Sequence, residues 1–118
     1  MSIKMTNAEA MNSLTVLGQI KETGKLGFAI AKNVRKLQEE LKEYLEKRDG
    51  LIRKYGHKTE DGQYMVENEQ VADFLKELRE YDTIEFSFNP QMVNEDVFCS
   101  GSLTSDQMYV LDWMVQDS

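Results

Sequence analysis

Cysteine, histidine and proline are almost absent from this chain of 118 residues, which has one of each. The lone Cys99 excludes an intramolecular disulfide, and a reducing compartment is the simplest interpretation. The lone proline argues against a disordered tail or a proline-rich linker. His57 and Cys99 are too few for a zinc site, and the acidic loops at 61–62 and 94–96 lack the alternating oxygen ligands of a calcium loop. We therefore expect no metal and no cofactor.

Long hydrophobic runs are also missing. No apolar segment approaches the roughly 20 residues that span a bilayer, and residues 1–13 lack the apolar centre of a signal peptide. The hydrophobic share of 41% and the charged share of 30% are typical of a folded, soluble protein. The length fits one domain with a modest core. We expect a cytoplasmic, single-domain protein without a membrane partner.

Catalytic signatures are the third absence. His57 and Cys99 could form a nucleophilic pair only if the fold brought them together. His57 follows a predicted helix end, where an imidazole interacts with free carbonyl groups, and Cys99 has the setting of a buried, inert thiol. Three glycines between residues 18 and 27 lack the strand–loop–helix context and the Lys-Ser/Thr of a phosphate-binding loop. The sequence therefore indicates a protein that is not an enzyme.

Acidity is concentrated in the second half of the chain. Residues 60–118 hold 14 acidic and 2 basic residues, a net charge of −12, whereas residues 1–59 hold 7 acidic and 12 basic residues, a net charge of +5. Such a surface repels DNA phosphates and attracts basic protein surfaces, although acidic surfaces also serve solubility. The basic clusters at 32–36 and 47–54 are interleaved with acids, so we expect them to pair with the acidic half of the same molecule or of a neighbour. Direct nucleic-acid binding is not expected.

The strongest helical pattern runs from about Leu26 to Tyr55. Its apolar residues are spaced by four and three, which is typical of a helix that packs one side against another helix. Gly50 is the expected point of a bend. A helix this long also allows a homodimer, in which the +5 and −12 segments would neutralise each other.

Shorter elements surround this helix. A short strand or an extended lead at 2–5 precedes a helix that begins with the capping box Thr6-x-x-Glu9. The Asp61-Gly62 pair predicts a hairpin, and residues 68–81 predict an amphipathic helix. Its buried apolar stripe is expected to comprise Val71, Phe74, Leu75 and Leu78.

The C-terminal region predicts one strand and one helix. Residues 84–88 alternate between apolar and polar side chains and indicate a strand, and residues 92–102 are expected to form a loop with a short strand at 97–98. Thr104 and Gln107 form a second capping box before the last helix. The fold class is α+β: a helix-rich single domain with one long central helix, two or three shorter helices and a small antiparallel sheet. Residues 1–56 are its helical, mildly basic half, and residues 57–118 its acidic α+β half.

Protein–protein contact is the function class that these absences leave. Phe86, Phe88 and Phe98 are expected to fill the core, whereas other aromatic residues of the acidic half can serve as anchors among the acids. Aromatic anchors supply affinity, and the surrounding charges supply encounter rate and specificity for a basic partner. The candidate partner-binding residues are Glu67, Glu69, Asp73, Glu77, Glu80, Asp82, Tyr64, Tyr81, Tyr109 and Trp113.

Five segments of the chain, taken in order, carry a resemblance to a family of proteins. They are Ala29–Leu37, Glu46–Gly56 with its Leu-Ile-Arg-Lys-Tyr-Gly end, Phe74–Leu78, Ile84–Phe86 and Leu103–Met108. Together they resemble an uncharacterised family of small proteins encoded by phages and prophages of Gram-positive bacteria. The resemblance covers nearly the whole chain and implies a phage protein in the cytoplasm of the infected or lysogenic bacterium. It implies no catalytic residues.

Two functions follow as hypotheses. In the first, the protein is a non-enzymatic effector that binds and inhibits a host protein through that protein's basic nucleic-acid-binding groove, with carboxylates in place of phosphates. An anti-CRISPR or another anti-defence inhibitor would fit this description. In the second, it is a structural or assembly protein of the phage that associates through its long helix.

Overall fold

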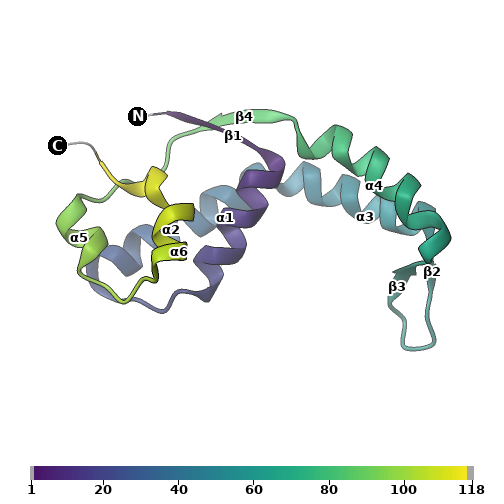
Figure 1. Ribbon diagram of the computed structural model, residues 1–118, viewed down its shortest axis with the longest axis horizontal. Helices are drawn as coiled ribbons and strands as arrows, with labels where there is room; N and C mark the ends of the chain where they lie inside the picture. Colours follow the sequence, from purple (N-terminus) through teal and green to yellow (C-terminus); the bar gives the residue numbers. More distant parts are fainter. Residues whose placement is uncertain (1, 117–118) are drawn as a thin grey trace.

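The computed structural model describes residues 2–116, and within them the predicted helix-rich α+β class is confirmed. Figure 1 shows a body, residues 2–41 and 83–116, from which an arm, residues 42–82, extends. The molecule is elongated, with extents of 49 × 29 × 23 Å. The elements are β1 (Ile3–Thr6), α1 (Asn7–Gln19), α2 (Gly24–Glu40), α3 (Lys42–Tyr55), β2 (Gly56–Lys58), β3 (Tyr64–Val66), α4 (Asn68–Asp82), β4 (Glu85–Phe88), α5 (Glu95–Cys99), α6 (Ser105–Val110) and the 3₁₀ turn η1 (Asp112–Met114).

Both predicted capping boxes are confirmed. Thr6 Oγ1 accepts from the amide of Glu9 at 3.1 Å, and Glu9 Oε1 accepts from the amide of Thr6 at 3.3 Å. Thr104 and Gln107 make the same reciprocal bonds, at 3.2 and 3.0 Å. Because each box satisfies amides that a helix start leaves free, these residues fix where α1 and α6 begin.

The long helical pattern is interrupted once, at Leu41, so that it forms α2 and α3. Leu41 is fully buried and has φ −87° and ψ 0°. The bonds from Leu41 N to Leu37 O (2.9 Å) and from Leu45 N to Leu41 O (2.8 Å) carry the helical pattern across it. The bend expected at Gly50 is wrong, since Gly50 lies exposed inside α3. This junction leads the chain from the body into the arm.

The predicted hairpin at Asp61-Gly62 is confirmed, with β2 and β3 antiparallel and Gly56 opposite Val66. Gly62 has φ 87°, a conformation that glycine adopts at little cost. Gly56 ends α3 in an extended conformation, and a Cβ there would lie 2.5 Å from Ile52 O and 2.8 Å from Met65 O. Glycine at this position therefore lets β3 pack closely on the end of α3.

Three local expectations are wrong. Residues 95–99 form α5 instead of a loop and strand, because Asn94 Oδ1 accepts from the amide of Val97 at 2.8 Å and caps the turn. Cys99 is exposed rather than buried. Leu75 of α4 is 48% exposed, because α4 packs chiefly on α3, which covers a narrower stripe than the apolar pattern suggests.

The hydrophobic core is continuous and is centred on the body. Its fully buried members include Leu17, Leu37, Leu111 and Met114, and the same cluster extends into the arm. Asn33 is also fully buried: its Nδ2 donates to Gln91 O at 3.0 Å, and its Oδ1 accepts from Gln91 N at 2.7 Å. This paired amide ties α2 to the segment that leads from β4 to α5, and it satisfies the polar groups there.

Replacing Asn33 by alanine should lower the free energy of unfolding by about 2 kcal/mol, because the amide and the carbonyl of Gln91 lose their partner. Urea denaturation followed by circular dichroism measures this change. The control is Gln38→Ala at an exposed position of the same helix, which should stay within about 0.5 kcal/mol of the parent. A loss in Asn33→Ala no larger than that of the control would contradict an anchoring role.

Candidate protein-binding surfaces

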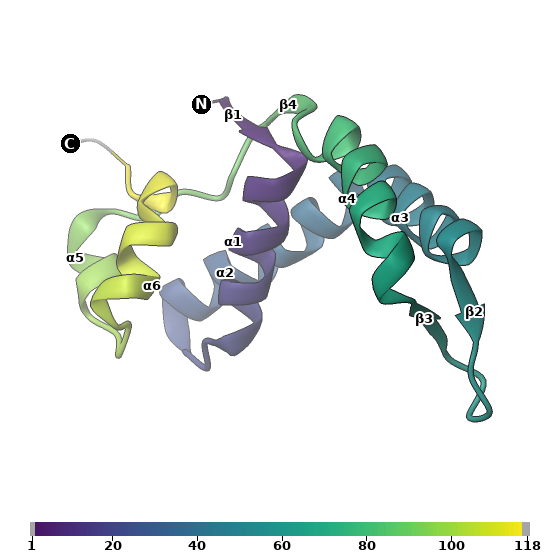
Figure 2. The same ribbon diagram turned by 45° about the vertical axis from the view of Figure 1, so that its right-hand side comes forward.

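The acidic helix α4 lies antiparallel along the basic helix α3, so charges that are far apart in the sequence meet in space (Figure 2). Lys54 Nζ lies 2.8 Å from Glu77 Oε1. The hydroxyl of Tyr55 donates to the same carboxylate oxygen, and near the N-terminal end of α3 the hydroxyl of Tyr44 donates to Asp82. Two acidic side chains of α4 are thus partnered by α3.

The fold divides the net charge evenly between the arm and the described part of the body. The arm holds 11 acidic and 8 basic residues, a net charge of −3. The described part of the body holds 9 acidic and 6 basic residues, which is also −3. Acidity is therefore a property of local surfaces, and a functional surface has to be sought on one side of one element.

The contacts between α3 and α4 shift the pKa values of several of their ionisable groups. The hydrogen bond from Lys54, followed by that from Tyr55, holds the pKa of Glu77 below its usual range. The same carboxylate raises the pKa of Lys54 and of Tyr55. Burial, followed by the hydrogen bond to Asp82, raises the pKa of Tyr44 to about 12.

Two of the predicted aromatic anchors, both on the arm, lie beneath cations of α3. Lys47 Nζ lies 5.1 Å from the centre of the Tyr81 ring, and the Arg53 guanidinium lies 5.9 Å from that of Tyr64. These distances fit cation–π contacts. Tyr81 is half-buried, whereas Tyr64 is 46% exposed and stays open to a partner.

The ten predicted partner-binding residues do not form one surface. Tyr109 and Trp113 lie on the body, in α6 and η1. The other eight lie on the arm: Glu67, Glu69, Asp73, Glu77, Glu80, Asp82, Tyr64 and Tyr81. Figure 1 shows that α6 and the arm occupy different ends of the molecule.

The acids of α4 divide into two groups. Glu77 and Asp82 are partly buried and bonded to α3, as described above. Glu69, Asp73 and Glu80 are exposed, and their spacing of four and seven residues places them along one side of the helix. We call these three residues the acidic stripe. They make no ion pair within residues 2–116.

Sequence reasoning missed several exposed apolar side chains, because their spacing resembles that of a core. Met65 is 55% exposed on β3, and Phe28 is 58% exposed on α2. Phe28 lines a groove of about 570 Å³ together with Met92 and Val97. The spacing of apolar residues along the sequence does not distinguish these exposed side chains from buried ones.

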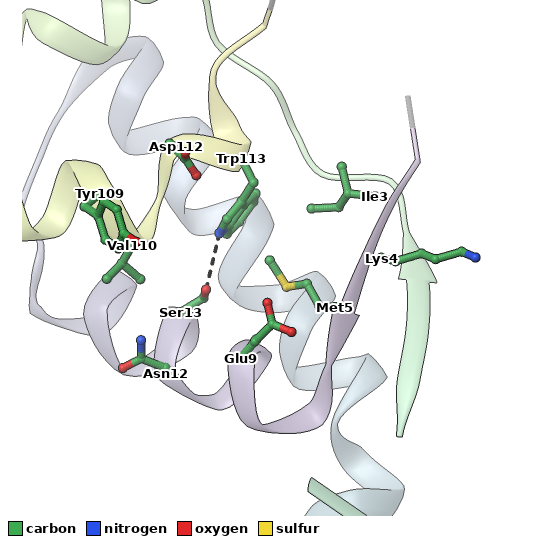
Figure 3. Close-up of a pocket in the computed structure, with 10 residues that line it drawn as sticks. All are labelled: Ile3, Lys4, Met5, Glu9, Asn12, Ser13, Tyr109, Val110, Asp112 and Trp113. Atoms are coloured by element: carbon green, nitrogen blue, oxygen red, sulfur yellow. Dashed lines mark hydrogen bonds between the residues drawn. The ribbon is translucent and has the colours of Figure 1, made fainter. Parts of the chain in front are cut away.

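A pocket of about 400 Å³ lies on the body between β1, α1 and the C-terminal turns (Figure 3). Two predicted anchors line it. The indole Nε1 of Trp113 donates to Ser13 Oγ at 3.2 Å, and Tyr109 is 83% exposed. Asn12 and the carboxylates of Glu9 and Asp112 add to its polar lining.

Two chemical possibilities find no supporting geometry. His57 lies in β2 of the arm, near Glu67 at 3.3 Å, and Cys99 lies in α5 of the body, so they do not form a pair (Figure 1). No group of three or more metal-ligating side chains occurs in the described part of the chain.

No helix among residues 2–116 has the length and apolar character needed to cross a membrane.

Comparison with known proteins gives no relative for this chain. No protein-family model, no curated protein and no solved structure matches it. The resemblance to phage proteins therefore stays a prediction, and the surfaces described above are the observations that bear on function.

The lowered pKa of Glu77 predicts an acid-dependent loss of stability. A carboxyl group whose folded pKa is depressed contributes stability above its unfolded pKa, about 4.3, and loses this contribution as the pH falls through the folded pKa. Glu77→Gln lacks this contribution, so its difference from the parent in unfolding free energy should shrink between neutral pH and about pH 3.

Urea denaturation at both pH values measures the difference. Glu39→Gln, at an exposed position outside the two ion pairs of the described chain, is the control and should show no comparable change. A Glu77→Gln difference that stays constant with pH would contradict the ionic role of this carboxylate.

Proposed function

We propose that this protein is a non-enzymatic, phage-encoded effector that binds a host protein through the acidic stripe and inhibits it. The partner would carry a basic, nucleic-acid-binding surface. An anti-CRISPR or another anti-defence inhibitor acting in the bacterial cytoplasm is the form that the phage resemblance favours. The observation that carries this proposal is that α3 partners Glu77 and Asp82 and leaves the stripe exposed.

The stripe has the electrostatic character that a phosphate-binding groove recognises. At 1.5 Å per residue, its carboxylates are spaced by about 6 and 10 Å along the helix. Repeated negative charge on a rigid element resembles a nucleic-acid backbone, since phosphates dominate the attraction between nucleic acid and basic proteins. Lys76, on the same side of α4, is the one opposing charge in this row.

Exposed apolar groups on the arm can add affinity to this charge. Tyr64 and Met65 of β3 are 46% and 55% exposed. Large side chains of this kind act as anchors when a partner excludes water from them, whereas charges at the rim govern the association rate. The hairpin and α4 together therefore offer both parts of a protein-binding surface.

The test uses protein immobilised on a resin and a lysate of a Gram-positive host, with captured proteins identified by mass spectrometry. We expect capture of a nucleic-acid-handling protein that is released by about 0.5 M salt, because salt screens exposed charges. Competing duplex DNA should release it as well. The variant with Glu69→Gln, Asp73→Asn and Glu80→Gln should lose the capture, whereas Lys76→Glu should strengthen it.

A matched control carries Glu39→Gln, Glu46→Gln and Asp49→Asn, which make the same change in net charge at exposed positions of α2 and α3. This control should keep the capture. Retention of the partner by the stripe variant, or indifference of the complex to salt and DNA, would contradict the proposal.

A second candidate is the structural or assembly protein that associates through its helix. The specific observation that favours it is Phe28, which is exposed on α2 beside an apolar groove formed with Met92, Val93 and Val97. In a homodimer, Phe28 of one copy could fill the groove of the other. A strict monomer in sedimentation at micromolar concentration would count against this role.

A further inference from the structure

The strand β1 has an unpaired edge with free backbone groups. In the described chain, β1 pairs with β4 alone. The amide of Asn7 donates to Ile84 O at 3.0 Å, and in an antiparallel ladder hydrogen-bonded pairs alternate with non-bonded ones. Met5 and Ile3 therefore bond to β4, and the amide and carbonyl of Lys4 point away from it. Thr6 follows the same rule, since its amide donates to Glu9 instead.

The strand that carries this free edge lines the pocket that contains Trp113. Ile3, Lys4 and Met5 all line the pocket. Figure 3 shows the side chain of Lys4 directed away from the other lining residues, so that Lys4 contributes its backbone. An extended peptide placed there would add a third strand to the sheet, which is a general mode of peptide recognition.

The opposite wall of the pocket suits a basic side chain. The indole of Trp113 is held by Ser13 and by an edge-to-face contact with Phe88, at 5.7 Å between ring centres. Tyr109 is almost fully exposed beside it. Glu9 and Asp112 belong to neither ion pair of residues 2–116, and the capping-box bonds of Glu9 use its Oε1 alone. Guanidinium and ammonium groups bind carboxylates and the faces of aromatic rings.

We propose that this edge and pocket form a second protein-binding site, which takes an extended segment with basic side chains at alternate positions. In the bound segment, the residue that lies opposite Lys4 forms two backbone hydrogen bonds with it, one to the amide and one to the carbonyl of Lys4. The side chains of its two neighbours point to the same side of the sheet as Ile3 and Met5, and so enter the pocket. The site lies on the body, and it does not depend on the acidic stripe.

The probe is the acetylated and amidated peptide Val-Arg-Val-Arg-Val. Trp113 is the sole tryptophan of the chain, so its fluorescence reports binding directly. We expect a saturable change with this peptide and none with Val-Glu-Val-Glu-Val. Asp112→Asn should weaken binding about tenfold, and so should an N-methyl group on the central valine, which removes the donor to Lys4 O.

Two proline variants test the strand edge. Lys4→Pro removes the free amide that faces the pocket and should weaken binding by about tenfold. Ser87→Pro is the matched control: Ser87 lies opposite Lys4 in the register, and its amide points to the other edge of the sheet. Ser87→Pro and Lys4→Ala should both bind as the parent does.

Equal binding of the arginine and glutamate peptides would overturn the proposal. So would parental affinity in Lys4→Pro or for the N-methylated peptide, or the absence of a saturable signal with the arginine peptide up to millimolar concentration. The N-methylated peptide keeps the test decisive if Lys4→Pro fails to fold, because it changes the ligand alone.

Discussion

The packing of α4 on α3 is the interaction on which the surface of this protein depends. Lys54 and Tyr55 converge on Glu77, and Tyr44 reaches Asp82, so both ends of α3 are bonded to the C-terminal part of α4. The rings of Tyr55 and Phe74 add an edge-to-face contact, at 6.4 Å between centres. This packing decides which acids of α4 are bonded to α3 and which face solvent, and therefore where a partner can bind.

The elements of the fold could be predicted from the sequence wherever a local rule determines them. Thr6 and Thr104 set helix starts through their capping boxes, and Gly62 supplies the positive φ of a hairpin. The helix break could not be predicted: Gly50 has the weakest helix propensity nearby, yet the bend lies at buried Leu41, where the arm leaves the core. Tertiary packing sets the position of the break, and this packing leaves no signal in the local spacing of apolar residues.

The residue types of the candidate surface could be named from the sequence, but their placement could not. The acids and aromatic residues named from the sequence do include exposed groups, but charge counted along the chain does not report which face a side chain occupies. Glu77 and Glu80 are three residues apart, yet one is bonded to α3 and the other lies in solvent. The edge of β1 could not be foreseen either, because an unpaired strand edge depends on which strands the topology places beside it.

A charge swap across the α3–α4 contact tests the central claim most directly. Lys54→Glu and Glu77→Lys each place like charges together, and each should lower the midpoint of urea unfolding. The double variant restores opposite charges in reversed order and should regain most of the loss, since only neighbouring residues couple in this way. Losses that simply add in the double variant would show that the two side chains do not meet, and would contradict the arrangement that leaves the acidic stripe exposed.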